Sequence, residues 1–235
     1  MKNLHNSLLL KQLYMLRQLG YRYTDIEPSS LEEESKNLPD DLHTLAKMTN
    51  ECHLCELSKH RNKVVFGEGN PNADLFFVGE GPGATEDSTG RPFVGRAGEL
   101  LTRMIENVLL IPRKDVYIGN IVKCRPPGNR EPSLTEAVTC RPYLLKQLEI
   151  VKPRIVITLG KTAYRYLTDD DSPIGKIRGS VINGSSYRIV PTFHPSYLLR
   201  NPSAKKMAYS DLLLIKKLMQ SMKDTDPSTD LDATL

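Results

Sequence analysis

The sequence contains no long apolar run, no internal repeat and only four cysteines. No window approaches the roughly 20 apolar residues that a membrane-spanning helix needs, which excludes such a helix. The apolar start, residues 1–20, is interrupted by Lys11, Gln12, Arg17 and Gln18, and no small-residue cleavage site follows it. We therefore expect no signal peptide and a cytoplasmic location.

The composition is that of a globular protein with a basic body. The 235 residues are 39% hydrophobic and 26% charged, so a core can be buried. The net charge of +4 is uneven: residues 51–222 carry 25 basic and 17 acidic residues, a net charge of +8, whereas both ends are acidic. This distribution favours a polyanionic partner such as nucleic acid, although many enzymes share it.

The two ends of the chain differ in pattern from the middle. Apolar residues recur at helical spacing over residues 4–19, and Gly20 is a suitable C-terminal cap. A polar, acidic segment with two prolines follows over 24–41 and is typical of a linker. We predict an N-terminal helix and acidic linker over 1–45, one folded domain over 46–222, and a disordered acidic tail over 223–235.

Strand-like and helical patterns alternate in the middle. Short apolar runs predict four strands, over 74–79, 116–122, 154–159 and 187–193. Helical patterns cover 97–110, 133–151 (split at Pro142), a segment from Lys161, and 205–222. The alternation predicts a three-layer α/β/α sandwich with a central, mainly parallel four-stranded sheet, plus the N-terminal helical extension. In such folds a ligand binds beyond the carboxyl ends of the strands, where GEGPG, Asn120 and His194 lie.

The four cysteines are consistent with one metal site. Cys52 and Cys55 form a C-x-x-C pair, and Cys124 and Cys140 follow much later. Four unrelated buried thiols, or a redox pair at the C-x-x-C, are the alternatives. A redox pair would follow a strand, however, and this one precedes the first strand. Zinc and an iron–sulfur cluster both accept four thiolates, and the spacing alone does not choose between them.

The segment from Gly79 to Ala84 matches the dinucleotide-binding pattern G-x-G-x-x-A. Three observations count against nucleotide binding. About a dozen polar and turn residues separate the motif from the next predicted helix, and Pro82 removes one backbone N–H from the loop. The second strand also ends near Asn120 rather than at an acidic residue that would bind a ribose.

Three longer segments make a family resemblance specific. They are GEGPGATEDSTGRPFVGRAGELL (79–101), YIGNIVKCRPPGNREP (117–132) and FHPSYLLRNP (193–202). Together with the order and separation of the cysteines, they resemble the signature blocks of family 4, iron–sulfur-containing uracil-DNA glycosylases. The match covers roughly residues 50–220. A sister family carries a basic insertion after the first block, and this sequence lacks it.

The resemblance implies an enzyme that flips uracil out of DNA, hydrolyses its N-glycosidic bond and leaves an abasic site. It implies a 4Fe–4S cluster held by Cys52, Cys55, Cys124 and Cys140, with zinc as the alternative. The partner would be uracil-containing DNA, single- or double-stranded, and we expect a monomer that does not contact a membrane. The only lysine in the motif blocks is Lys123, and nothing marks it as a Schiff-base former, so strand cleavage is not expected.

The resemblance also assigns the uracil-binding residues. Phe93 would stack on the flipped base, and the Asn120 amide would read the uracil edge. Glu86 would lie near C5, where a thymine methyl group would clash. His194 would donate to uracil O2 as negative charge develops there, as an oxyanion hole does. Gly81 stands where family 1 enzymes have an aspartate.

The catalytic set is therefore His194, Asn120 and two candidate carboxylates for the attacking water, Glu80 and Glu86. A merely positioned water is the alternative, since an oxocarbenium-like sugar is reactive. Leu198 fits an apolar wedge that fills the space left by the flipped base. The proposed phosphate contacts are Ser196, Arg200, Lys123 and Arg125.

Two functions from other classes remain open on the sequence. The first is a non-catalytic iron–sulfur or zinc module that binds nucleic acid, and a uracil-release assay separates it from the glycosylase. The second is a nucleotide-dependent enzyme, which predicts binding of NAD or FAD.

Overall fold

The structure is a computed structural model that describes residues 38–184 and 186–224. The predicted helix over 4–19, most of the predicted linker, and the predicted tail from residue 225 lie outside the described residues. The described residues from Pro39 onward form one compact unit, which contains all the elements below. The domain boundary predicted at 45–46 stays a prediction. Within the described residues, no helix is both long and apolar enough to cross a membrane.

A six-stranded sheet forms the centre, and its strand order is β1-β3-β2-β4-β6-β5. The predicted strands correspond to β2 (Leu75–Gly79), β3 (Tyr117–Asn120), β4 (Ile155–Leu159) and β6 (Arg188–Thr192), which are parallel to one another. Two further strands, β1 (Glu68–Gly69) and β5 (Ile182–Asn183), add to the edges as antiparallel neighbours. With two residues each, these edge strands are too short for a sequence period to reveal.

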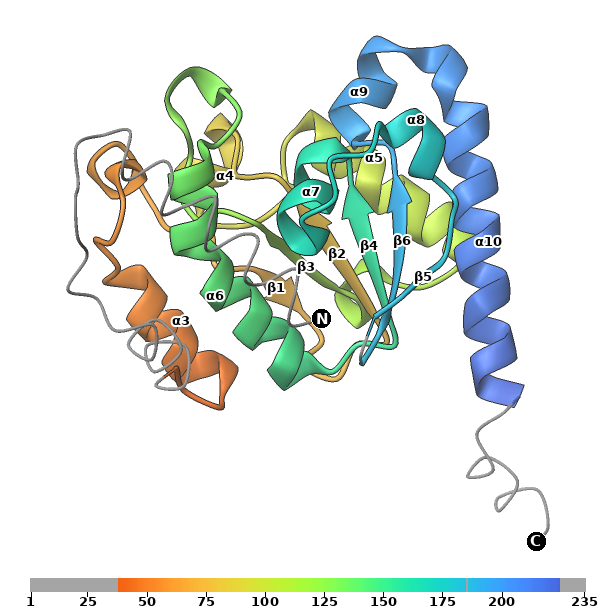
Figure 1. Ribbon diagram of the computed structural model, residues 1–235, viewed down its shortest axis with the longest axis horizontal. Coiled ribbons are helices and arrows are strands. Elements are labelled where there is room, and N and C mark those ends of the chain that lie inside the picture. Colours follow the sequence, from red (N-terminus) through yellow and green to blue (C-terminus); the bar gives the residue numbers. More distant parts are fainter. Residues whose placement is uncertain (1–37, 185, 225–235) are drawn as a thin grey trace, which may run out of the picture. The chain divides into compact units, whose positions relative to one another are not determined.

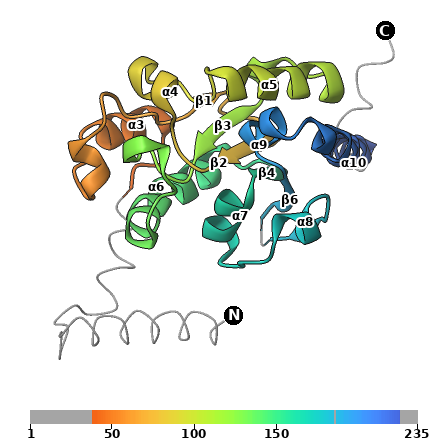
Figure 2. The same ribbon diagram turned by 90° about the horizontal axis from the view of Figure 1, so that it is seen from above.

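Helices cover both faces of the sheet, which explains why every residue of its two central strands, β2 and β4, is buried. On one face lie α5 (Arg96–Met104), its π-helical continuation (Ile105–Leu109) and α10 (Lys205–Asp224). On the other lie α6 (Leu134–Val151) and α7 (Lys161–Thr168). The short α8 (Ile174–Ile177) lies beside β6, and its Ile174 packs against the core that α5 and α10 share. Figure 2 shows the two helical layers with the sheet between them, so the predicted three-layer α/β/α class is confirmed.

Two predictions about the helices are wrong. Pro142 does not split its helix, because α6 runs unbroken for 18 residues. The proline removes one N–H from the carbonyl of Val138, which lies on the exposed side of the helix. The glycine motif is also followed directly by a helix, α4 (Ala84–Thr89). Its signal was Glu86, three residues after Gly83, whose carboxylate accepts from the Gly83 N–H at 3.2 Å.

Shorter elements complete the described residues. A helix that we did not predict, α3 (Leu42–Asn50), is capped by the Asp41 side chain and packs against α6. The helix α9 (Pro195–Arg200) follows β6. Short 3₁₀ helices of three or four residues lie at Glu56–Lys59, Arg113–Asp115, Pro127–Asn129 and Pro202–Ala204. Along the sheet, the chain proceeds from β2 to β3 on one side and to β4 and β6 on the other. This topological switch between β2 and β4 is where ligands bind in open α/β sheets.

Candidate functional site

A cavity of about 490 Å³ opens at the switch point, at the carboxyl ends of the four parallel strands. These ends lie at the top of the sheet in Figure 1, beneath α9. Glu80 and Gly81 follow β2, Asn120 ends β3, Leu159 ends β4, and His194 follows β6. Segments more than 100 residues apart therefore contribute to one cavity. The lining also includes Gly83, Glu86, Phe93, Ser196 and Arg200.

Asn120 presents an unpaired acceptor. Its side chain is 1% exposed, and its Oδ1 atom is one of two buried side-chain oxygens without a hydrogen-bond partner in the described residues. A buried polar atom without a partner costs about 1–3 kcal/mol, so it needs a reason. Gly79 supplies the room: a Cβ there would lie 2.3 Å from Asn120 Oδ1 and 2.6 Å from the Phe93 ring. A ligand N–H that enters the cavity would satisfy this acceptor.

Phe93 is held in a strained backbone conformation. Its φ is 50°, which is unusual for a bulky residue, and such strain persists where the surrounding structure enforces it. The backbone of Phe93 packs directly against Gly98 on α5, where a Cβ would lie 1.9 Å from the Phe93 carbonyl oxygen. Only glycine at position 98 allows this close approach. The Phe93 ring lines the cavity, with its centroid 5.7 Å from that of the His194 ring. The two rings therefore form adjoining walls.

His194 is a neutral imidazole whose proton lies on Nε2. It is the N-cap of α9, and its Nδ1 accepts from the Ser196 backbone N–H at 3.1 Å. The Ser196 hydroxyl lies 2.7 Å from the same nitrogen. An accepting Nδ1 assigns the proton to Nε2, which becomes a donor. Burial lowers the pKa of His194 to about 4, with a smaller contribution from Arg200 that Glu86 opposes.

Glu86 joins the two loops that line the cavity. Its Oε2 atom accepts from the Gly83 N–H at 3.2 Å, and its Oε1 atom accepts from the N–H groups of Val94 and Gly95 at 2.9 Å each. Both carboxylate oxygens are thus used to hold the glycine loop against the turn that carries Phe93. From the sequence we predicted that Glu86 belongs to the site, but not that its carboxylate links these two loops.

Glu80 is a half-buried carboxyl on the cavity wall. Burial raises its pKa, and a hydrogen bond from Thr162 opposes that shift. Nearby Glu131 raises the pKa further, whereas Arg165 lowers it. Glu80 is therefore suited to hold a polar molecule beside the pocket, and its proton affinity exceeds that of an exposed glutamate.

The structure contradicts two of the predicted DNA contacts. Leu198 is 1% exposed and packs in the apolar core, so it cannot act as a wedge. Its neighbour Tyr197 is 39% exposed and lines the cavity instead. Lys123 is also 1% exposed, and its ammonium lies inside the protein, where it bonds to Asn120 and Gln147. Lys123 therefore cannot reach a phosphate.

The other predicted contacts lie near the cavity mouth. Arg200 is exposed on its rim, and the half-buried Arg125 donates to Asn129 at 2.8 Å. Two rim cations were not predicted: Arg130, paired with Glu136, and Lys161, paired with Asp171. Ser196 bonds to His194, so it positions the imidazole.

The four cysteines converge around a second, smaller cavity beside α6. Cys52, Cys55, Cys124 and Cys140 all line it, and none of them forms a disulfide. The Arg61 guanidinium donates to Cys124 Sγ at 3.3 Å. Burial raises the pKa of Cys55, Cys124 and Cys140, the last to about 12. Within the described residues, no group of three or more His, Cys, Asp or Glu side chains is placed to hold a single metal ion.

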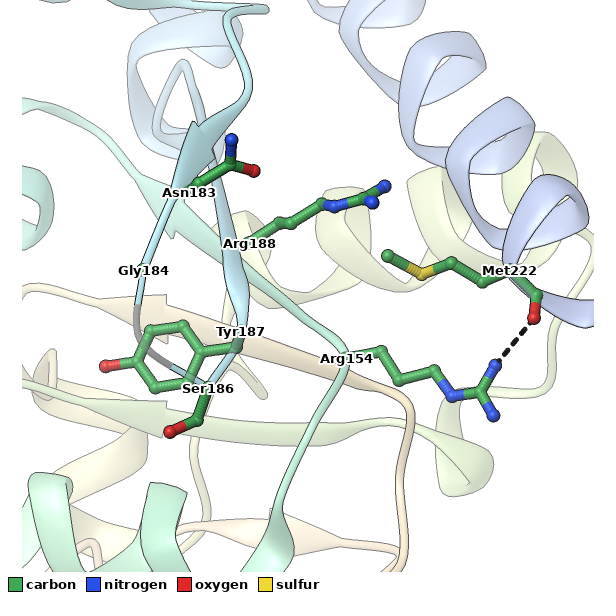
Figure 3. A pocket seen from close by; sticks show the side chains of 7 residues that line it. All are labelled: Arg154, Asn183, Gly184, Ser186, Tyr187, Arg188 and Met222. Carbon is green, nitrogen blue, oxygen red and sulfur yellow. Dashed lines mark hydrogen bonds between the residues drawn. The ribbon is translucent and has the colours of Figure 1, made fainter. Parts of the chain in front are cut away.

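A third cavity, of about 520 Å³, lies at the opposite end of the sheet (Figure 3). It is formed around the starts of β4 and β6, where Arg154 donates to the Met222 carbonyl at 3.0 Å. None of the residues predicted from the sequence lines it. The cavity at the carboxyl ends, with its unpaired Asn120 oxygen, is therefore the better candidate for the functional site.

Comparisons with known proteins show which family the chain belongs to. The family model described as the Uracil DNA glycosylase superfamily matches residues 66–214. The chain is 43% identical over 190 residues to the type-4 uracil-DNA glycosylase of Saccharolobus solfataricus, covering 77% of this chain and 88% of that protein. It is 48% identical over 164 residues to the protein of the same name from Thermotoga maritima, covering 69% and 85%. A type-5 uracil-DNA glycosylase of Pyrobaculum aerophilum is 33% identical over 146 residues, covering 55% and 64%.

Proposed function

Because the chain belongs to the uracil DNA glycosylase superfamily and is a hydrolytic uracil-DNA glycosylase, we propose that one extruded uracil occupies the cavity at the strand ends. The bond between uracil and deoxyribose cannot be reached inside a duplex, so the nucleotide must leave the stack. The observation that carries the proposal is the buried, unpaired Oδ1 of Asn120, which lies against Gly79 in the lining of the cavity.

Asn120 would identify the base. Its Oδ1 would accept from uracil N3–H, and its Nδ2 would donate to uracil O4. Cytosine presents an acceptor and a donor at these positions, the reverse arrangement, and would leave both pairs unmatched. Phe93 would stack on the base without identifying it, since every base offers a π-face. Glu86 would act through the loops it holds, and its predicted place near C5 stays a prediction.

His194 would stabilise the leaving group. As the N-glycosidic bond breaks, its electron pair moves into the uracil ring and negative charge develops at O2. The Nε2–H of His194 would donate to that oxygen, while Ser196 holds the ring through Nδ1. A donor aimed at a developing oxyanion contributes about 2.7–4 kcal/mol. Because burial keeps the imidazole neutral, this support does not depend on a proton taken from solvent.

Glu80 would hold the attacking water. The departing uracil leaves an oxocarbenium-like sugar, and a water oxygen then bonds to C1′ and loses a proton. Glu80 lines the cavity close to the Gly81 backbone, and its carboxylate form could accept that proton. The products are free uracil and an abasic site. Phosphates would be held at the rim, with Arg200 and Arg125 as the retained candidates, and strand cleavage is not part of the reaction.

Uracil release from labelled DNA tests the function directly. Oligonucleotides with one uracil, single-stranded or paired with guanine or adenine, should yield free uracil and an abasic site that breaks only after alkali. Matched oligonucleotides with thymine or cytosine at the same position should remain intact. Binding of uracil-containing DNA with no uracil release would contradict the glycosylase assignment and favour a non-catalytic nucleic-acid-binding module.

The four cysteines would hold a 4Fe–4S cluster. They converge on one cavity, and no three of them are placed to hold a single metal ion. A cluster spreads its four thiolate ligands around a larger body than one zinc ion does, so this arrangement favours the cluster. When bound, the cluster would brace the segment from Cys124 to Cys140, and the glycosylase chemistry would remain with the cavity residues. Such a protein suits the reducing cytoplasm, where thiols stay free, and we propose that it acts there as a monomer.

Protein purified without oxygen should contain iron equivalent to one cluster per chain. It should also show a broad absorption band in the visible range. Cys140→Ala should lower the iron content and the thermal unfolding midpoint together, because ligand binding stabilises the folded state. Elemental analysis and circular dichroism measure the two effects. Zinc without iron would contradict the cluster, and so would a Cys140→Ala protein with full iron content.

A further inference from the structure

Lys123 is a buried cation that the reaction described above does not use. Its side chain is 1% exposed, and its Nζ donates to the Asn120 carbonyl oxygen at 2.9 Å and to Gln147 Oε1 at 2.5 Å. The Phe66 ring lies 6.0 Å away. Within residues 38–184 and 186–224, no ion pair with a carboxylate accompanies these contacts. Burying a lysine is costly unless its donors are satisfied inside the protein, so these two hydrogen bonds fix where the amine lies.

The acceptor Gln147 is itself held in place. Its Nε2 donates to the Phe66 carbonyl oxygen at 3.0 Å, which turns its Oε1 toward Lys123. Gln147 lies on α6 seven residues after Cys140, so both residues face the same side of the helix. The ammonium is thereby anchored to the helix that carries one of the four cysteines.

The backbone of Lys123 is tied to the same place. Its N–H donates to Cys140 Sγ at 3.3 Å, and the next residue in the chain is Cys124. One residue therefore contacts the four-cysteine cavity through its backbone and Asn120 through its side chain. The distance between the two sites along the chain is four residues, from Asn120 to Cys124.

We propose that Lys123 is a positioning residue that transmits the geometry of the four-cysteine site to the uracil-reading amide of Asn120. The Nζ bond fixes the carbonyl of Asn120 and with it the backbone from which the amide projects. The amide must meet two groups on one base edge, and hydrogen bonds weaken steeply when their angles are wrong. A small rotation of the residue would therefore impair base recognition while leaving the cavity intact.

The inference rests on the proposed function, because Asn120 must read uracil for its position to matter. Replacing Lys123 by methionine keeps the length of the side chain and removes its donors. We expect Lys123→Met to lower kcat for uracil release about 10- to 100-fold, the usual effect of losing a partner that orients a functional ligand. Iron content and affinity for uracil-free DNA should not change. Lys146→Met is the matched control, since it removes a lysine from α6 that pairs with Asp40 and Glu149 outside the site.

A double-mutant cycle separates positioning from a general loss of stability. If Lys123 acts through Asn120, Lys123→Met should have little further effect in an Asn120→Ala background. Equal losses in both backgrounds, or an active Lys123→Met protein, would overturn the inference. If Lys123→Met does not fold, Gln147→Met provides the same cycle by removing one acceptor. Failure of both to fold would assign the network to the scaffold and also overturn it.

The same cycle tests the proposed uracil site and the positioning role of Lys123 separately. Full activity of Asn120→Ala alone would contradict the proposed site, whatever Lys123 does. Loss of activity in Asn120→Ala with no loss in Lys123→Met would leave the proposed function intact and reject only the positioning role.

Discussion

Replacing His194 by alanine lowers kcat for uracil release by roughly 100- to 1,000-fold, the usual effect of removing one donor to a developing oxyanion. The expected loss falls mainly on kcat, because the donor is most needed once charge has moved onto uracil O2. Single-turnover kinetics on a uracil-containing oligonucleotide measures it. His60→Ala is the control, since His60 is exposed and does not line the cavity, and its rate should equal that of the unaltered protein.

The pH profile gives the same prediction a second test. Burial lowers the pKa of His194 from 6.5 to about 4, so the imidazole stays neutral from pH 8 down to about pH 5. The contribution of His194 to the rate should therefore be constant across that range and decline only as the pH approaches 4. The unfolded chain binds the proton at a higher pH than the folded one, so stability should fall between about pH 6.5 and 4. A His194-dependent step near pH 6.5 would contradict the neutral donor.

Replacing Asn120 by alanine removes both hydrogen bonds that read the base edge. Two polar groups of the bound uracil then lack partners, at about 1–3 kcal/mol each, so kcat/KM should fall by roughly 30- to 10⁴-fold. Free uracil should also bind more weakly, which calorimetry measures. Asn107→Ala, at an exposed position of the π-helical segment, is the control and should leave kcat/KM unchanged.

Affinity for uracil-free DNA should respond differently from uracil release in the Asn120→Ala variant. The alanine variant loses recognition of uracil while Phe93 still stacks, so its affinity for uracil-free DNA should be retained. An Asn120→Ala protein that releases uracil at the normal rate would show that the unpaired Oδ1 has no part in recognition, and the proposed site would have to be abandoned.

The sequence predicted the architecture well, because the strongest signals are long-range and repeated. Four apolar runs became the parallel strands, and parallel strands with short connections must present their carboxyl ends at one edge. That rule brought Asn120 and His194 together although they lie 74 positions apart in the sequence. The family assignment, which depends on the three motif blocks, is confirmed by the family model and the curated relatives.

The remaining errors concern properties that depend on packing. The sequence cannot give the phase of a six-residue helix, and α9 turns Leu198 into the core and Tyr197 outward. Lys123 looked like a phosphate contact because charge usually indicates exposure, but the fold buries it. The edge strands and α4 were too short for a periodic pattern.

The unpaired oxygen of Asn120 carries a cost that the protein bears whenever no base is bound. An apolar residue of similar size would remove that cost, so the most stable sequence for this backbone differs from the active one at residue 120. Selection for thermal resistance alone would therefore favour an inert variant. Only selection for activity preserves an amide there.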